Sequence, residues 1–317
     1  MYFRIKPLEQ AWNRLFMRIV GRMMPPAPSE KPDWEEGSHR VLYLRYDRIG
    51  DMILATSLIE AIARSHPTIR LDVLASPANA SVLENNPYID NIIIWDKIRA
   101  AGYGELRRKM QKTKYDAVVD SMVLAPSTTT LLLMLASKAK HRIGIGGRIN
   151  DYALTMRVPP AVSAAHFIDR SAALATAFGV DLDELDWRPS LYFTDAELKR
   201  ANESWQSRPR LLVNVSVGRP RDRWPDDRFI SVLNHVRKKF PETDIVVIGA
   251  PSEVVRAGRI AKASNTRFVR TPKIRDALAL VATSDFVLTP DTAITHAASA
   301  CNKPAVVLFE KGKQDLW

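Results

Sequence analysis

Residues 41–55 read VLYLRYDRIGDMILA, and this stretch decides the class of fold. Its β-branched and apolar start predicts a buried strand over 41–46, and the apolar spacing that follows predicts a helix over 52–65. A short polar turn between them contains Gly50 and ends at Asp51. We expect Gly50 to permit a bend that a Cβ would hinder. We expect Asp51 to lie at the helix N-terminus, where free N–H groups favour a carboxylate, so that it either only caps the helix or also takes part in chemistry.

The same alternation of short apolar strands and helices continues along the chain. It is typical of parallel sheets that are covered by helices on both faces. A polar, proline-containing segment over 180–209 separates two such sets. The sequence therefore predicts an α/β protein with two Rossmann-like, doubly wound domains that face a cleft, with ligands at the carboxyl ends of the strands. Strands are expected at 41–46, 71–75, 92–95, 116–120, 141–145, 211–215, 245–249, 267–269, 286–289 and 305–309, and helices at 52–65, 103–113, 226–239, 252–263, 273–283 and 292–301.

The first 40 residues differ from the rest. Apolar side chains recur at helical spacing over residues 1–24, and Arg or Lys fills many of the other positions. Such a basic amphipathic helix, rich in Trp and Phe, lies either in an anionic headgroup layer or on the protein's own core. Residues 25–39 are polar and rich in proline, which predicts a linker. We therefore divide the chain into this helix and linker (1–40), an N-terminal Rossmann-like domain (41–195) and a C-terminal Rossmann-like domain (196–317).

The composition indicates which partners to expect. The 317 residues carry a formal net charge of +11, which favours anionic partners such as nucleotides, phosphorylated glycans and membrane surfaces. No nucleic-acid-binding pattern accompanies this charge, so we expect no nucleic-acid partner. The single cysteine, Cys301, excludes an internal disulfide, and no Cys/His spacing indicates a zinc site. The sequence ends soon after the last expected strand, so the C-terminal domain is either truncated or has its covering helix elsewhere.

A second informative stretch is DFVLTPDTAITHAASACNKPAVVLF at 285–309. A strand that ends at Pro290 leads into a helix for which Asp291 is the expected N-cap. The free N–H groups of a helix N-terminus at this edge of a sheet can bind a pyrophosphate. His296 lies one turn into the helix, on the same face as Thr292, so it either packs structurally or faces the same ligand.

A third stretch is NVSVGRPRDRWP at 214–225. A strand ends here, and a loop that begins at Ser216 contains three arginines before Trp224-Pro225 opens the next helix. Such a loop either binds phosphates through hydroxyl, backbone and guanidinium donors or is a solvated basic loop. The arginines are Arg219, Arg221 and Arg223.

Taken together, these motifs resemble glycosyltransferase family 9, the lipopolysaccharide heptosyltransferases, over nearly all of residues 41–311. The loop at the start and the Asp-Thr-x-x-x-His helix near the end are specific in combination, although neither is specific alone. The motifs are the Arg-x-x-x-x-Gly-Asp loop (45–51), Asn86-Pro87 before Asp90, the helix start at 166–170, Trp224-Pro225 and the helix at 291–296.

The resemblance implies a GT-B fold and an inverting transfer of a sugar from a nucleotide donor without a metal or other cofactor. By position, Asp51 matches the family's catalytic base, which takes the proton of an acceptor hydroxyl as that oxygen attacks the anomeric carbon. Donor and phosphate binding then falls to Ser216, Arg221, Arg223, Asp291, Thr292, Ala293 and His296. Acceptor binding falls to Arg45, Gly50 and His166, with Arg142 and Arg148 as further residues that could face an anionic acceptor.

Two positions depart from the family's pattern. Asp222 stands where the family usually has a lysine, and Ala293 stands where it usually has a glycine. An acid beside a diphosphate is unfavourable, so either a neighbouring arginine replaces the lysine or donor handling has changed. The methyl group of Ala293 narrows the approach to the phosphate that glycine allows.

The sequence therefore predicts an inverting, metal-independent glycosyltransferase that is cytoplasmic and peripheral on the inner face of the inner membrane. The expected donor is a nucleotide sugar, ADP-heptose first, and the expected acceptor is lipopolysaccharide core or a similar anionic lipid-linked glycan. Two alternatives stay open. One is a degenerate GT-B protein that binds glycan or membrane without catalysis, and the other is a non-metal nucleotide-sugar epimerase that needs no acceptor.

Overall fold

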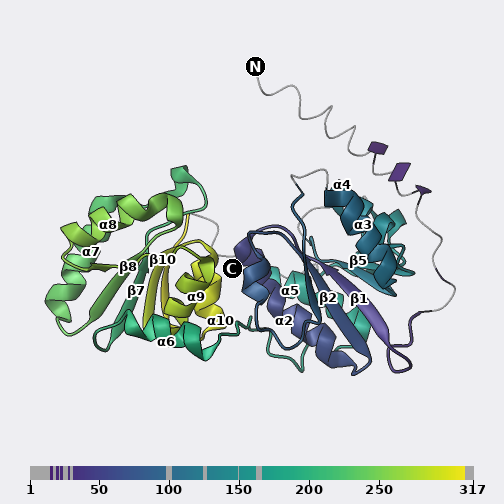
Figure 1. The fold of residues 1–317 in the computed structure, drawn as a ribbon, viewed down its shortest axis with the longest axis horizontal. Coiled ribbons are helices and arrows are strands. Elements are labelled where there is room, and N and C mark those ends of the chain that lie inside the picture. Colours follow the sequence, from purple (N-terminus) through teal and green to yellow (C-terminus); the bar gives the residue numbers. More distant parts are fainter. Residues whose placement is uncertain are drawn as a thin grey trace, which may run out of the picture. The chain divides into compact units, whose positions relative to one another are not determined.

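The chain forms two compact units, each built around a parallel sheet (Figure 1). This confirms the predicted α/β class with two Rossmann-like sheets. The computed structural model describes residues 15–16, 19–20, 22–23, 28, 31–97, 102–123, 127–148, 150–161 and 166–310. The first unit comprises Met1–Asp47, Ser57–Ala80 and Pro87–Trp187, and the second comprises Arg48–Thr56, Ser81–Asn86 and Arg188–Trp317.

The first unit has a six-stranded sheet in the order β3-β2-β1-β4-β5-β6. Every pairing in it is parallel, and Tyr43 of the central strand β1 aligns with Val73 of β2 and Val119 of β4. All three side chains are fully buried, which is why these strands read as continuous apolar runs. The strands are β1 (His39–Leu44), β2 (Ile69–Ala75), β3 (Asn91–Ile94), β4 (Ala117–Asp120), β5 (His141–Ile145) and β6 (Met156–Val158).

Four α-helices accompany this sheet in the described part of the chain. Leu106 and Met110 of α3 and Leu131 and Met134 of α4 pack into one core with the apolar residues of β1. The sequence did not predict α4, because most of its residues are buried and it lacks the polar face that marks an amphipathic helix. The helices are α2 (Ile49–Ser65), α3 (Gly102–Thr113), α4 (Thr128–Ser137) and α5 (Phe167–Ala172).

The second unit has a five-stranded parallel sheet in the order β11-β10-β7-β8-β9. Phe229 and Leu233 of α7 and Ile260 of α8 pack on the core residues of β7 and β8. Because crossovers between parallel strands are right-handed, the helices that lead back across the sheet, α9 and α10, lie on its other face (Figure 1). The strands are β7 (Arg210–Asn214), β8 (Asp244–Ile248), β9 (Arg267–Phe268), β10 (Phe286–Pro290) and β11 (Ala305–Leu308). The helices are α6 (Asp195–Glu203), α7 (Asp226–Lys239), α8 (Val254–Ala263), α9 (Ile274–Thr283) and α10 (Ala293–Ala300).

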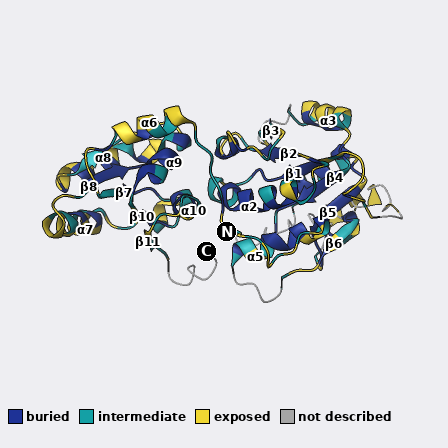
Figure 2. Cartoon of the chain, turned by 90° about the horizontal axis from the view of Figure 1, so that it is seen from below, coloured by how far each residue is buried: buried dark blue, intermediate teal, exposed yellow. Residues whose placement is uncertain are grey.

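Each sheet has one point where the strand order reverses. In the first sheet this point lies between β1 and β4, and in the second it lies between β7 and β10. Ligands of doubly wound sheets bind outside the carboxyl ends of the strands at such a switch point. The loops after these four strands are therefore the places to look for a site. Figure 2 shows that both sheets are largely buried and that the outer faces of α3 and α6 carry many of the exposed residues.

Most of the expected N-terminal helix (1–24) lies outside the described residues. Within the described positions, Val20 is buried in the core of the first unit, whereas the exposed fractions of four large apolar residues lie between 42% and 64%. These four residues are Leu15, Phe16, Ile19 and Met23. In the described ranges of the chain, no helix is both long enough and apolar enough to cross a membrane.

Part of the predicted linker (25–39) is fixed to the first unit. Trp34 is buried, stacks on Phe178 with a centroid distance of 4.8 Å, and donates from Nε1 to the carbonyl of Ala177 at 2.9 Å. Composition alone could not reveal this, because one aromatic anchor is enough to fix a polar segment.

Candidate functional site

A cavity of about 220 Å³ opens at the switch point of the second sheet. It is lined from the loop after β7, from the end of β10 and from the segment after β11. Three of the predicted donor-binding residues line it, namely Arg221, Arg223 and Asp291, together with Asp222 and Trp224. The fold thus brings together two motifs that are about seventy residues apart in the sequence.

Asn214 joins the ends of β7 and β10. Its Nδ2 donates to Thr289 Oγ1 at 3.0 Å and to Thr292 Oγ1 at 3.2 Å, and its Oδ1 accepts from the backbone N–H of Ser216 at 3.0 Å. Ser216 Oγ in turn accepts from the backbone N–H of Ala250 at 2.5 Å, in the loop after β8. The predicted phosphate-binding hydroxyl therefore also holds two loops together at this edge.

Thr292, and not Asp291, is the N-cap of α10. The Thr292 backbone is extended, and its Oγ1 accepts from the backbone N–H of Ile294 at 3.3 Å. Asp291 lies one residue earlier, and Ala293 is the first residue of the helix. The prediction of an Asp291 cap was wrong, because a threonine one residue further on makes the same hydrogen bond. The first N–H groups of α10 still lie at this edge of the sheet.

The start of α2 contacts α10 within the second unit, which includes Arg48–Thr56. A Cβ on Gly50 would lie 2.7 Å from His296 Cδ2 and 3.6 Å from Ala293 Cα. Because α2 begins at Ile49, Gly50 is helical and Asp51 lies in the first turn. The expected position of Asp51 at the N-terminal end of a helix is therefore confirmed, whereas the expected bend at Gly50 and a cap at Asp51 are wrong. What excludes a side chain at Gly50 is its contact with the buried His296.

Each arginine of the loop after β7 faces a carboxylate. Arg219 Nε donates to Asp222 Oδ2 at 2.7 Å, and Arg221 Nε lies 3.6 Å from Asp222 Oδ1. Arg223 instead donates from Nε and Nη2 to Glu253 Oε1, at 2.9 and 2.6 Å. The negative charge of Asp222 is thus countered by its own neighbours, Arg219 and Arg221.

Sequence reasoning missed Glu253 and Arg256. Arg256 Nη1 donates to Glu253 Oε2 at 2.9 Å, and both side chains are largely buried. They are three residues apart with opposite charges, which is the spacing at which helical side chains interact. The sequence shows this spacing, but it does not show the ion pair between Glu253 and Arg223, which lies thirty residues earlier.

At the switch point of the first sheet, Arg45 is buried. Its Nη1 donates to the carbonyl of Ser121 at 2.6 Å, its Nε lies 3.1 Å from Asp47 Oδ1, and its guanidinium lies over the ring of Phe167. Asp120, the last residue of β4, is also buried, and burial raises the pKa of its carboxyl to about 6.

The other predicted acceptor residues lie at different places in the first unit. His166 is the N-cap of α5, and its Nδ1 accepts from the backbone N–H of Ile168 at 3.1 Å. Arg148 lies in the loop after β5, and its positive charge lowers the pKa of Asp120 against the effect of burial. The prediction for Arg142 was wrong, because its guanidinium is buried and donates to the carbonyls of Ala153 and Ala139.

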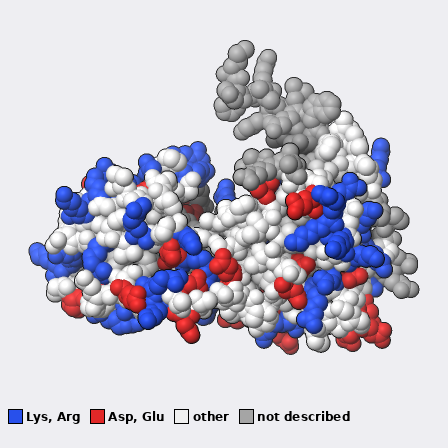
Figure 3. All heavy atoms as spheres, viewed as in Figure 1, with Lys and Arg blue, Asp and Glu red and all other residues white. Residues whose placement is uncertain are grey.

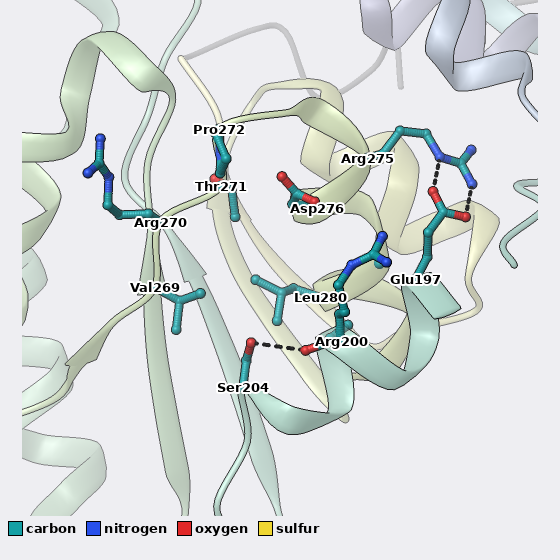
Figure 4. Close-up of a pocket in the computed structure, with 12 residues that line it drawn as sticks. Glu197, Arg200, Ser204, Val269, Arg270, Thr271, Pro272, Arg275, Asp276 and Leu280 are labelled. Carbon is teal, nitrogen blue, oxygen red and sulfur yellow. Dashed lines mark hydrogen bonds and ion pairs between the residues drawn. The ribbon is translucent and has the colours of Figure 1, made fainter. Parts of the chain in front are cut away.

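A second cavity, of about 280 Å³, lies between α6 and α9 and contains none of the predicted site residues (Figure 4). The ion pair between Arg275 and Glu197, at 2.6 Å, forms part of its wall. Among the residues that the structure describes, no group of three or more His, Cys, Asp or Glu side chains is placed to hold a metal ion.

The comparison with protein families decides the family. The model for glycosyltransferase family 9 (heptosyltransferase) matches residues 103–317. The chain belongs to this family. It is therefore a glycosyltransferase, and its two sheets are the Rossmann-like halves of a GT-B fold.

Known relatives are similar to this transferase over most of its length. The lipopolysaccharide core heptosyltransferase of Haemophilus influenzae is 21% identical over 287 residues, which cover 88% of this chain and 81% of that one. A solved family 9 glycosyltransferase from Veillonella parvula superposes with a TM-score of 0.75 at 18% identity and covers 87% of both chains. An Escherichia coli heptosyltransferase solved with ADP gives a TM-score of 0.68 at 19% identity, over 84% of this chain and 86% of that one. At these identities, the two structures show the shared fold.

Proposed function

We propose that this transferase moves a sugar, with inversion, from a nucleoside diphosphate donor to lipopolysaccharide core or a similar anionic lipid-linked glycan. ADP-heptose is the donor that we expect, because relatives are named as lipopolysaccharide heptosyltransferases and one was solved with ADP. The observation that carries the proposal is the cavity at the β7–β10 switch point, where an arginine-containing loop meets the start of α10.

We assign the donor diphosphate to this edge of the second sheet. The N–H groups at the start of α10 and the guanidinium groups of Arg221 and Arg223 are positive there, and Thr292 and Ser216 add hydroxyl groups. Fixed donors of this kind stabilise the charge that develops on a leaving diphosphate, and they need no metal. The carboxylate of Asp222 does not oppose them at full strength, because Arg219 pairs with it at 2.7 Å.

We assign the role of general base to Asp51. An acceptor hydroxyl oxygen attacks the anomeric carbon, the bond from that carbon to the diphosphate oxygen breaks, and the hydroxyl proton passes to the carboxylate. Asp51 lies in the first turn of α2, so its carboxylate belongs to the N-terminal end of this helix. Gly50 brings this turn against His296 and Ala293 of α10, so base and diphosphate site share the second unit.

We further propose that the transferase works as a peripheral protein on an anionic membrane surface, the cytoplasmic face of the inner membrane. The support is the net charge of +11 and the exposed apolar residues Leu15, Phe16, Ile19 and Met23, beside the buried anchor Val20. Apolar side chains next to basic ones are the composition of helices that lie in a headgroup layer.

One experiment tests the assignment of the base and the donor together. Calorimetry with ADP and a panel of nucleotide sugars would be combined with a transfer assay, for the wild type and for Asp51→Asn. We expect both proteins to bind ADP alike, and the variant to transfer sugar about 10²- to 10⁴-fold more slowly.

Other outcomes would favour the competing functions. Absence of binding to any nucleotide would indicate a degenerate relative that binds glycan or membrane. A changed nucleotide sugar in the absence of acceptor would indicate an epimerase. A transfer rate that Asp51→Asn leaves unaltered would remove this residue from the mechanism.

A further inference from the structure

A chain of ion pairs runs from the donor cavity into the second unit. It begins at Arg223, whose side chain is half exposed and lines the cavity. Arg223 donates from Nε and Nη2 to a single oxygen of Glu253, which is only 6% exposed. The other oxygen of Glu253 accepts from Arg256. A buried carboxylate is costly unless it is paired and hydrogen-bonded, and here both of its oxygens are.

Arg256 connects this pair to the loop that carries the Trp-Pro motif. Its Nη1 also donates to the carbonyl of Val215 at 2.6 Å, and its Nη2 donates to the carbonyl of Trp224 at 2.7 Å. Its Nε donates to Asp226 Oδ1 at 2.7 Å, in the first turn of α7. One guanidinium therefore fixes the end of β7, the end of the loop and the start of the next helix.

The loop between these fixed points contains three arginines and one aspartate, Asp222. Two of the arginines, Arg219 and Arg221, face Asp222. Arg223 is the loop arginine whose partner, Glu253, lies outside the loop and is buried. Nε and Nη2 of Arg223 are bonded to Glu253, and among the described residues its Nη1 has no hydrogen-bond partner, so this nitrogen can still donate to a ligand in the cavity that Arg223 lines.

We infer that Glu253 and Arg256 are positioning residues of the donor site, which hold Arg223 as the cation that faces the donor's phosphates. The inference rests on the proposed function, since it names the group that a nucleoside diphosphate meets at that site. Its physical basis is preorganisation, because a cation fixed before the ligand arrives needs no reordering when charge develops.

The test compares the affinities for ADP and adenosine, measured by calorimetry on the full chain. Only the ratio of the two affinities reports the phosphate part of binding. We expect Arg223→Gln to lower the affinity for ADP about 10- to 100-fold, the range for lost hydrogen bonds to a charged group, and to leave that for adenosine within about twofold. Glu253→Gln should lower the ratio about tenfold, because a neutral amide no longer holds Arg223 and Arg256 by the attraction of a negative charge. Arg256→Lys should also lower this ratio, because an ammonium group cannot donate to all the partners that the planar guanidinium of Arg256 binds.

The matched control is Arg259→Gln, on the same helix as Arg256. Arg259 pairs with Asp226 at the surface, and within the described part of the chain it makes no hydrogen bond or ion pair with Glu253 or the loop. We expect this variant to keep the wild-type ratio.

Three outcomes separate the possibilities. If Glu253→Gln lowers thermal stability but leaves the ratio of ADP to adenosine affinity unchanged, the network is only structural and the inference is overturned. If the variants of the buried residues Glu253 and Arg256 do not fold, Arg223→Gln still tests the inference, because the Arg223 side chain is half exposed. An unchanged ratio of ADP to adenosine affinity in Arg223→Gln again overturns the inference. If the wild type binds no nucleoside diphosphate, the proposed function fails first, and this result is distinct from the other two.

Discussion

Asp120 shows how a single buried carboxyl group makes the stability of the first unit depend on pH. Burial raises its pKa from 3.8 to about 6, although the N–H of Met122 and the charges of Arg148 and Arg45 act in the opposite direction. A folded-state pKa above the unfolded value means that the folded state binds the proton more tightly. The stabilisation is therefore complete below about pH 4 and is lost as the pH rises through about 6.

The first prediction follows from the direction of this pH dependence. Asp120→Asn removes the titrating group but keeps an oxygen that can accept from Met122. We expect the unfolding free energy of the wild type to fall relative to that of the variant by up to ~3 kcal/mol between pH 4 and pH 7. Denaturant titrations at several pH values would measure the difference, with Asp183→Asn, an exposed site, as the control. Parallel pH profiles for wild type and Asp120→Asn would contradict the prediction.

Gly50 gives a second prediction, in which two effects of opposite sign compete. Replacement of a helical glycine by alanine normally stabilises a helix by about 1 kcal/mol. Here the new Cβ would lie 2.7 Å from His296, whose ring is buried, and overpacking costs typically about 1–3 kcal/mol. We therefore expect Gly50→Ala to lower both thermal stability and the transfer rate.

Gly258 in α8 offers the matched control for this substitution. A Cβ there would meet only Phe268, at an ordinary contact distance of 3.8 Å. We expect Gly258→Ala to raise the melting temperature, as helix propensity alone predicts. A stabilising Gly50→Ala would show that His296 moves aside at little cost.

At the scale of single residues, the sequence predicts features that depend on neighbouring residues, but not contacts with residues far away in the chain. The positions of Gly50, Asp51 and His296 near helix starts could be predicted, because each belongs to a short motif at the start of a helix. The direction of the Arg142 side chain could not, because one of the carbonyls that bind it, that of Ala153, comes from a separate short helical turn eleven residues later. The partner of Arg223 could not be predicted either, since Glu253 is thirty residues away in the sequence.

At the scale of elements, α10 depends on its cap. Thr292 Oγ1 accepts from the N–H of Ile294 and from Nδ2 of Asn214, so one oxygen ties the helix start to the end of β7. Loss of such a cap costs about 1 kcal/mol of helix stability. We expect Thr292→Ala to raise amide hydrogen exchange in the first two turns of α10 about fivefold, the factor that corresponds to this energy.

A serine at the same position separates the hydroxyl from the methyl group. Thr292→Ser keeps the accepting oxygen and should leave the exchange rates of α10 near those of the wild type. The exchange of α8 amides, which are remote from the cap, should be unchanged in both variants. Equal protection of α10 in Thr292→Ala and wild type would show that Asn214 and Thr289 hold this edge without the cap.

The elements that could be predicted are those with a clear period or a continuous apolar run. The strands at the centre of both sheets and the amphipathic helices α3, α7 and α8 satisfy this condition. The strand β6 is too short to give a pattern, and the helix α6 follows a polar, proline-containing stretch that reads as a boundary. What marks the start of α6 is its capping box, Thr194 with Glu197, which is a local signal that the apolar pattern does not include.

At the scale of the whole molecule, charge is the property that the sequence predicts most directly. The excess of 46 Lys and Arg over 35 Asp and Glu is a property of composition, and Figure 3 shows Lys and Arg on the visible surface of both units. Composition does not say which of these cations are already paired. In the second unit Arg223, Arg256, Arg259 and Arg275 all face carboxylates, so their charge is partly neutralised within the fold.

The last prediction concerns the membrane. Leu15, Phe16 and Ile19 are exposed while Val20 is buried, so their substitution should not disturb the core. We expect Leu15→Ser, Phe16→Ser and Ile19→Ser together to reduce co-sedimentation with anionic phospholipid vesicles at least about tenfold, because each apolar side chain buried in the interface contributes roughly 1.5–3 kcal/mol. Binding by the wild type should weaken with added salt and be lower on vesicles of neutral lipid, because the attraction to the headgroups is electrostatic. Val255→Ser, at an apolar site of α8 that is 85% exposed, is the control for loss of surface hydrophobicity alone. If the triple variant sediments like the wild type and only salt alters binding, the exposed apolar residues play no part, and the positive charge alone accounts for the association.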